Sequence, residues 1–292
     1  MEITASMVKE LRETSGAGMM DCKKALSECN GDMDKAMEYL REKGIAKSAK
    51  KESRIAAEGL ANIFIDGNKA VILEVNSETD FVSKNEEFIN MIDAIGHGLL
   101  KSDAHSLEEA NEVETEFGKI SDYIIEKIAK IGEKLSLRRF EIVSKEDDEV
   151  FGEYLHMGGK IAALTVLKGA NTEVARDVAM QAAAMKPLYL DIASVPEEVV
   201  ANERKIQKEL AMNEGKPADI AEKMVEGRIK KYYKEVCLVE QPFVKDGDVS
   251  VKDYVSKNNG EVLKMIRYEV GEGMEKRSDN FAEEVMNQVK GN

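Results

Sequence analysis

The hydrophobic positions of residues 4–44 recur at helical spacing in three short runs. Thr4 is placed to cap a helix that carries Met7, Val8 and Leu11, and residues 15–18 end it. A second helix over 19–29 follows, and a third begins after Asp32, with Gly44 expected to stop it. This pattern predicts a small three-helix module at the start of the sequence.

The spacing changes beyond residue 54. The apolar runs 60–65 and 70–76 predict a β-hairpin with its turn at 66–68, followed by helices over 88–95 and 115–135 and a strand over 136–143. A second set follows: a hairpin of 151–157 and 161–167, a helix over 173–185 and a strand over 263–270. We interpret this as an internal duplication of two α+β subdomains, although any two hairpins look somewhat alike.

Residues 196–236 interrupt the second set with an antiparallel helical hairpin of coiled-coil type. The apolar positions are Val199, Ile206 and Leu210 on one arm and Ile220, Met224 and Tyr232 on the other. A lone helical hairpin buries little of its own apolar stripe, so it needs a neighbour. Docking on the parent domain and pairing with a second copy of the chain both remain open.

Two segments are expected to connect modules. Residues 41–54 hold six basic and two acidic residues, which indicates a solvated linker and a mobile N-terminal module. Residues 271–273 form a glycine hinge before a last helix over 278–289, which docks either elsewhere or on its own domain. The fold class is therefore α+β, divided as 1–53 (N-terminal domain with linker), 54–144 (first subdomain), 145–195 with 237–272 (second subdomain), 196–236 (hairpin) and 273–292 (C-terminal module).

Charge and composition exclude several classes of protein. The 42 Lys and Arg against 56 Asp and Glu leave a net charge of −14, and there is no Trp, so direct nucleic-acid binding is disfavoured. The three cysteines form no C-x-x-C pair, which favours a reducing cytoplasm. No apolar run approaches the ~18 residues that a membrane span needs, so we expect neither export nor membrane insertion.

Recognisable catalytic chemistry is missing from the sequence. The run 152–160 lacks the spacing and the hydroxyl residue of a phosphate-binding loop, and the histidines at 97, 105 and 156 are scattered. We expect no enzymatic activity, no cofactor and no metal site. An active site of carboxylates that converge only in space stays an alternative.

One short segment stands out, residues 76–82, directly after an apolar strand. Ser77 with Asp80 and Ser83 with Glu86 fit the capping-box pattern, which favours a strand-to-helix turn with Phe81 plugged into the core. The alternative is an aromatic side chain held at the tip of a turn, able to wedge into a partner.

Six separated motifs carry a resemblance to a known family: residues 11–26, Glu78-Thr79-Asp80-Phe81-Val82, Gly158-Gly159-Lys160-Ile161, and residues 222–228, 241–244 and 267–273. Together they resemble the bacterial elongation factor Ts family, the nucleotide-exchange factors for elongation factor Tu, along essentially the whole chain. The resemblance implies a ubiquitin-associated-like N-terminal domain, two related core subdomains, an inserted coiled coil and a C-terminal helical module.

The resemblance also implies a partner and the residues that bind it. The partner is elongation factor Tu, GDP-bound or nucleotide-free, whose magnesium and phosphate site is disturbed so that GDP leaves and GTP can bind. The implied exchange residues are Thr79, Asp80, Phe81, Val82, His156, Gly158 and Gly159. Residues of the N-terminal module that are implied to grip the partner are Leu11, Arg12, Met19, Met20, Asp21 and Cys22.

Overall fold

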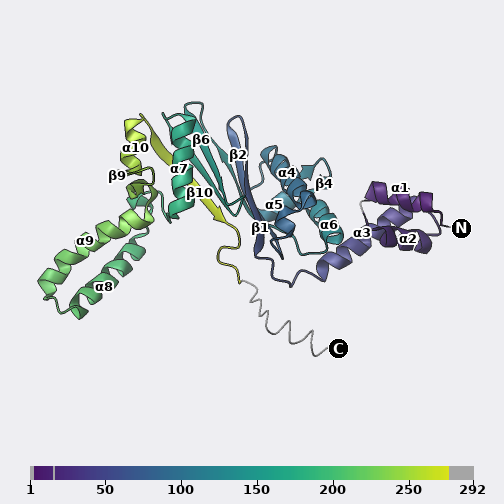
Figure 1. Ribbon diagram of the computed structural model, residues 1–292, viewed down its shortest axis with the longest axis horizontal. Helices are drawn as coiled ribbons and strands as arrows, with labels where there is room; N and C mark the ends of the chain where they lie inside the picture. The colour runs from purple at the N-terminus through teal and green to yellow at the C-terminus, as the bar shows by residue number, and fades with distance from the viewer. Residues whose placement is uncertain (1–2, 16, 276–292) are drawn as a thin grey trace. The chain divides into compact units, whose positions relative to one another are not determined.

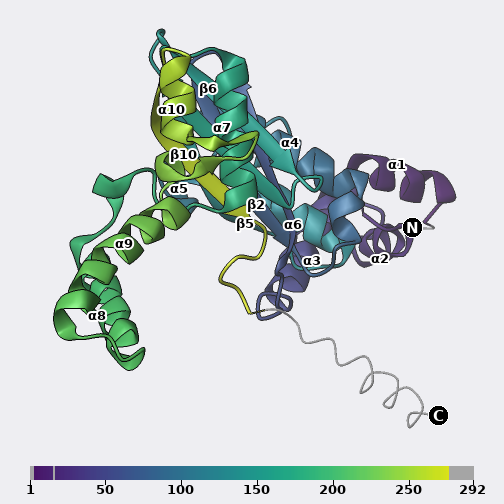
Figure 2. The same cartoon turned by 60° about the vertical axis from the view of Figure 1, so that its left-hand side comes forward.

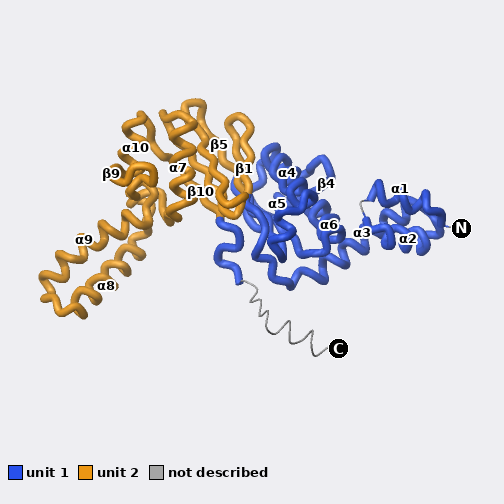
Figure 3. The backbone as a smooth tube through the Cα atoms, viewed as in Figure 1, with its two compact units in different colours: residues 1–61, 73–141, 269–292 blue, residues 62–72, 142–268 orange. Residues whose placement is uncertain are grey.

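The structure is a computed structural model that describes residues 3–15 and 17–275 (Figure 1). Its contacts divide the chain into two compact units (Figure 3). Unit 1 comprises residues 1–61, 73–141 and 269–292, and unit 2 comprises residues 62–72 and 142–268. The helix expected over 278–289 lies outside the described residues.

Unit 1 begins with the three-helix module, as predicted. Its helices are α1 (Ala5–Ser15), α2 (Met19–Glu28) and α3 (Met33–Ala49). The Thr4 hydroxyl accepts a hydrogen bond from Met7 N at 3.3 Å, and the Asp32 carboxylate accepts one from Lys35 N at 3.1 Å, so both predicted caps form. A small core closes the module, made of Val8, Leu11, Cys22, Ala25, Leu26 and Ala36.

Helix α3 does not stop at Gly44 but continues to Ala49. The prediction of a solvated linker is therefore wrong over the last turns of α3. Gly44 is buried against helix α6 (Ile120–Ile131), where a Cβ atom on it would lie 3.7 Å from Ala129 Cβ. Arg41 pairs with Asp122 at 2.8 Å, and Lys47 pairs with Asp21 at 2.9 Å. These two basic residues therefore have acidic partners that are distant in the sequence, which a local charge count cannot reveal.

The first predicted hairpin and its returning strand also form. Strands β1 (Glu58–Asp66), β2 (Lys69–Ser77) and β5 (Ser136–Ser144) make a sheet of order β1-β2-β5. Helix α4 (Glu86–Leu100) buries Phe88, Ile92 and Ile95 as their spacing predicts. The helix expected over 115–135 begins only at Ile120, because the preceding residues form strands β3 (Glu114–Thr115) and β4 (Gly118–Lys119) after the short helix α5 (Leu107–Asn111).

Unit 2 holds the second sheet, of order β10-β7-β6, formed by β6 (Glu149–His156), β7 (Ile161–Lys168) and β10 (Glu261–Glu269). Helix α7 (Thr172–Met185) packs over β6 and β7, as both views show (Figures 1 and 2). The packing is close at Gly152, where a Cβ atom would meet Ala175 O at 2.0 Å. Strands β8 (Pro242–Phe243) and β9 (Asp246–Ser250) and helix α10 (Val251–Lys257) also belong to this unit.

The two sheets share one topology. In each, a hairpin comes first and the third strand, which follows helices in the sequence, pairs with the second strand of the hairpin. Strand order is independent of the sequence likeness on which the duplication was inferred. It therefore supports two related α+β halves.

The inserted hairpin consists of α8 (Glu197–Asn213) and α9 (Ala218–Val236), which pack side by side. Their contact buries Ala211, Ala221, Val225 and Ile229. Arg228 pairs with Glu214 at 2.9 Å and Lys208 with Glu222 at 3.1 Å across the two arms. As expected, the hairpin buries little of its apolar stripe. Ile206, Leu210 and Ile220 remain exposed, and the other three stripe residues are half-buried: Val199, Met224 and Tyr232.

Candidate functional site

The turn that follows strand β2 displays an aromatic side chain. Phe81 is 81% exposed, Asp80 beside it is exposed, Thr79 is half-buried and Val82 is buried. The prediction that Phe81 plugs the core is wrong, and the alternative, an aromatic at the tip of a turn, is confirmed. Because Val82 anchors the chain directly after Phe81, the ring is presented from a fixed base.

Local hydrogen bonds shape this turn differently from the predicted capping boxes. The Ser77 hydroxyl donates to Thr79 O at 2.9 Å, and the Ser83 hydroxyl donates to Asp80 O at 2.6 Å. The cap of helix α4 is Asn85, whose side chain accepts a hydrogen bond from Glu87 N at 2.8 Å. The serines therefore stabilise the turn itself and do not start a helix.

Two glutamates join the turn to the segment after helix α6. Glu133 accepts hydrogen bonds from Glu78 N and Thr79 N, each at 3.0 Å, and from the Thr79 hydroxyl at 2.6 Å. Glu78 in turn accepts from Lys134 N at 2.6 Å and pairs with Arg54 at 3.1 Å. Sequence reasoning missed Glu133, because nothing in its neighbourhood indicates a partner more than fifty residues away.

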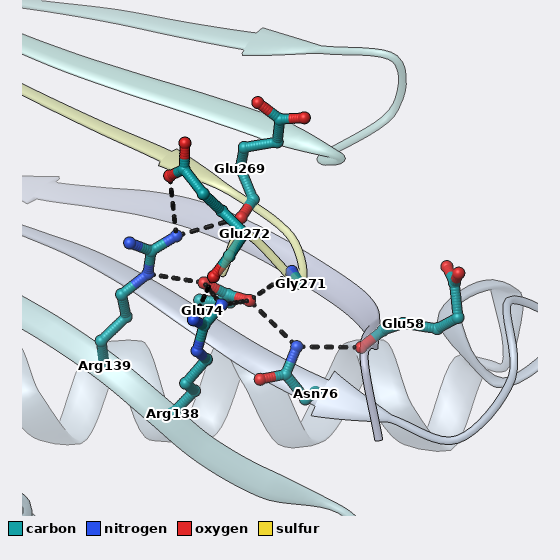
Figure 4. Close-up of polar contacts among 8 residues, drawn as sticks. All are labelled: Glu58, Glu74, Asn76, Arg138, Arg139, Glu269, Gly271 and Glu272. Carbon is teal, nitrogen blue, oxygen red and sulfur yellow. Dashed lines mark hydrogen bonds and ion pairs between the residues drawn. The ribbon is translucent and has the colours of Figure 1, made fainter. Parts of the chain in front are cut away.

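Glu74, a residue of strand β2, is wholly buried, and both of its carboxylate oxygens accept hydrogen bonds (Figure 4). Its carboxylate accepts hydrogen bonds from Arg139 Nε at 2.6 Å, Arg138 Nη1 at 3.0 Å, Asn76 Nδ2 at 3.0 Å and Gly271 N at 2.8 Å. The two arginines also donate to the carbonyl oxygens of Glu269 and Glu272. The expected glycine hinge is therefore anchored at Gly271.

Burial by itself would raise the pKa of the Glu74 carboxyl. The hydrogen bonds from Gly271, Asn76 and Arg138 and the charge of Arg139 outweigh burial, so the pKa lies below its ordinary value of 4.5. Sequence reasoning missed this cluster, and the signal that could have indicated it is a lone glutamate inside the apolar run 70–75. Both of its carboxylate oxygens are occupied by donors of the chain itself, which favours a structural role.

In unit 2, the turn of the second hairpin carries another set of candidate residues. His156 ends strand β6, is half-buried, and stacks on Tyr154 with ring centroids 6.1 Å apart. Gly158 is exposed and Gly159 is buried, with Gly159 N donating to His156 O at 3.2 Å. Met157, which was not counted among the expected exchange residues, is 70% exposed and has a positive φ of 51°. The exposed Leu155 adds to an apolar tip around His156.

The candidate residues of the N-terminal module divide into two groups. Leu11 and Cys22 are wholly buried, so they support the surface from below. Met19 and Met20 are exposed at the start of α2, and so is Arg12 on α1. Asp21 is half-buried in its pair with Lys47, and it lines a cavity of about 430 Å³ between this module and helix α6.

The described residues hold no grouping typical of catalysis at a metal. Within residues 3–15 and 17–275, no three His, Cys, Asp or Glu side chains are arranged to hold a metal ion. All three cysteines are free thiols. None of the helices in the described part of the chain is long and apolar enough to cross a bilayer.

The comparison with known families identifies the chain. Residues 78–272 match the family described as Elongation factor TS. The match begins in the Phe81 turn and ends at Glu272, so it takes in strand β5 of the first sheet, the whole second sheet, the helical hairpin and the Gly271 anchor. It covers about two thirds of the sequence, and the protein therefore belongs to the elongation factor TS family, whose role is in translation elongation.

Proposed function

We propose that this protein is a guanine nucleotide exchange factor for elongation factor Tu. It binds the GDP-bound form, disturbs the magnesium and phosphate site, and leaves a nucleotide-free complex that GTP can enter. The observation that carries the proposal is Phe81, an 81% exposed aromatic on a turn held by hydrogen bonds. A large aromatic that is both exposed and held in place is typical of a residue that dominates an interface.

The mechanism is one of differential affinity. A factor that binds its partner best when nucleotide and magnesium are bound poorly must, by linkage, weaken their binding by the same factor. A coupling of about 1.4 kcal/mol changes affinity about tenfold. Phe81 and Asp80 supply one contact that enters the partner, and the apolar tip around His156 supplies another. No proton transfer or covalent step is needed, so we propose no enzymatic activity and no cofactor.

The test is release of a fluorescent GDP analogue from elongation factor Tu. Catalytic amounts of the protein are expected to accelerate release, and addition of GTP is expected to complete the exchange. Unchanged release at micromolar protein would favour an interaction adaptor instead. Turnover of a small substrate by the isolated protein would favour an enzyme with carboxylates that converge in space.

Two further expectations accompany this function. We place the activity in the cytoplasm, without direct binding to nucleic acid or membrane. Pairing with a second copy through the hairpin of α8 and α9 stays a prediction, which sedimentation of the wild type against Leu210→Glu would test, because Leu210 is exposed on that hairpin.

A further inference from the structure

The turn that presents Phe81 is held by Glu133, a residue from a different segment of the chain. Glu133 is half-buried and lies directly after Gly132, the left-handed residue that ends helix α6. Both of its carboxylate oxygens are used: Oε2 accepts from two successive backbone N–H groups, and Oε1 accepts from the Thr79 hydroxyl. A carboxylate bound by this many donors forms strong, charge-assisted hydrogen bonds.

The junction is reciprocal. Glu133 binds the backbone of residues 78 and 79, while the Glu78 side chain accepts from the backbone N–H of Lys134. Each segment thus satisfies backbone groups of the other, and a slip of either would leave donors unpaired.

A further set of hydrogen bonds connects the same junction to the end of the N-terminal module. Lys51 Nζ donates to Gly132 O at 2.6 Å, and Lys134 Nζ donates to Arg54 O at 3.1 Å. Arg54 pairs with Glu78. The residues that follow helix α3 and the Phe81 turn are therefore held against one short segment, residues 132–134.

We propose that Glu133 is a positioning residue for nucleotide exchange. It holds residues 78 and 79 in the conformation that presents Asp80 and Phe81, and it acts through that turn without touching the partner. Without Glu133 the turn would sample other conformations, and ordering it would oppose binding. This inference rests on the proposed function, because it gives Glu133 a part in exchange only if Phe81 has one.

The experiment measures release of fluorescent GDP from elongation factor Tu. It compares the single variants Glu133→Ala, Glu133→Gln and Phe81→Ala with the double variant Phe81→Ala/Glu133→Ala. Glu133→Ala is expected to slow exchange by about three- to thirtyfold, because the cost of ordering a loosened turn cannot exceed what its aromatic side chain contributes to the interface. In the Phe81→Ala background the same change is expected to have almost no further effect. Glu133→Gln keeps one acceptor oxygen and is expected to lie between the wild type and the alanine variant.

Two measurements separate positioning from loss of fold. Thermal unfolding identifies any variant that fails to fold, in which case Glu133→Gln carries the test. Amide hydrogen exchange at residues 78 and 79 is expected to accelerate in the Glu133 variants. Glu126 is an exposed glutamate on helix α6, and Glu126→Ala is the matched control, which should leave nucleotide exchange unchanged.

The outcomes distinguish the two proposals. If Phe81→Ala exchanges nucleotide as fast as the wild type, the Phe81 mechanism and the role of Glu133 are both wrong. If Phe81→Ala is slow but Glu133→Ala is normal, only the positioning role is wrong. If Glu133→Ala slows the Phe81→Ala protein by the full factor again, Glu133 acts independently of the turn and the inference is overturned.

Discussion

Glu74 and Arg139 form an ion pair of 2.6 Å in which the glutamate side chain is wholly buried. The pair joins strand β2 to strand β5, and the same carboxylate accepts a hydrogen bond from Gly271 N. One buried carboxylate therefore connects three segments that are distant in the sequence. Breaking a buried pair from one side leaves the other charge uncompensated, and this costs more than the pair itself is worth.

We therefore expect Glu74→Gln to lower the free energy of unfolding by about 3 kcal/mol, since Arg138 and Arg139 would both lose the charge of Glu74, and Arg139 would keep the longer pair with Glu272 at 3.7 Å. Urea unfolding followed by circular dichroism measures this loss. Glu116→Gln, at an exposed position of unit 1, is the control and should shift stability by less than about 0.5 kcal/mol. Equal losses in both variants would contradict the role of the buried cluster.

The same carboxylate makes stability depend on pH. The pKa of Glu74 is lower in the folded chain than its ordinary value of 4.5, so the folded state binds this proton less readily than the unfolded state. Its contribution is present above pH 4.5 and is lost as pH falls through the lower, folded pKa. Glu87 shifts in the same direction, because hydrogen bonds from Lys127 and Lys130 lower its pKa.

The unfolding free energy of the wild type should therefore decline as pH drops below about 4.5, and Glu74→Gln should decline less steeply. Urea midpoints measured at several pH values test this. Parallel slopes for the two proteins would show that Glu74 does not carry the acid sensitivity.

Local patterns predicted most of the secondary structure but not the contacts between segments that are distant in the sequence. The hairpins and helix α7 follow from alternation, turn residues and helical spacing, all of which act within a few residues. Gly44 shows the limit. Glycine is expected to end a helix, but here it lies inside α3, buried against α6, and only the fold shows that neighbour.

Replacing that glycine offers a direct test of the packing. A Cβ atom at Gly44 would meet Ala129 and Ile125 at 3.7 and 3.8 Å, which is ordinary contact, so Gly44→Ala should stabilise the chain by up to about 1 kcal/mol through helix propensity. At Gly152 the same change places Cβ 2.0 Å from Ala175 O, and we expect a loss of about 3 kcal/mol. Thermal and urea unfolding of both variants measure the contrast, and similar behaviour of the two would contradict the packing described for α3 and α7.

The candidate site was predictable only in part, again because contacts between segments distant in the sequence decide which side chains are exposed. The turn after β2 could be located from the sequence, but the side chain that accepts its hydrogen bonds, Glu133, is remote in sequence, so the exposure of Phe81 could not be predicted. Likewise, the motif around residues 11–26 does not distinguish the buried Leu11 and Cys22 from the exposed Met19 and Met20. Exposure at these positions is set by the packing of the three helices.

Phe81→Ala should slow nucleotide exchange by about thirtyfold, the effect of losing roughly 2 kcal/mol at an interface hot spot. Because the ring is 81% exposed, stability should change by less than about 0.5 kcal/mol. Phe117→Ala is the control, since Phe117 is also exposed but lies outside the turn. A drop in unfolding temperature for Phe81→Ala would instead indicate a role in the core.

The three thiols should differ sharply in reactivity. Burial, together with the charges of Glu240 and Asp191, raises the pKa of Cys237 to about 11, so at pH 8 only about one molecule in a thousand carries its thiolate. Cys22 is buried, whereas Cys29 is half-exposed. We expect one thiol per folded chain to react rapidly with a disulfide reagent at pH 8, and Cys29→Ser to abolish that phase. All three thiols should react in denaturant, and a fast phase that survives in Cys29→Ser would show that the core around Cys22 or Cys237 opens in the folded chain.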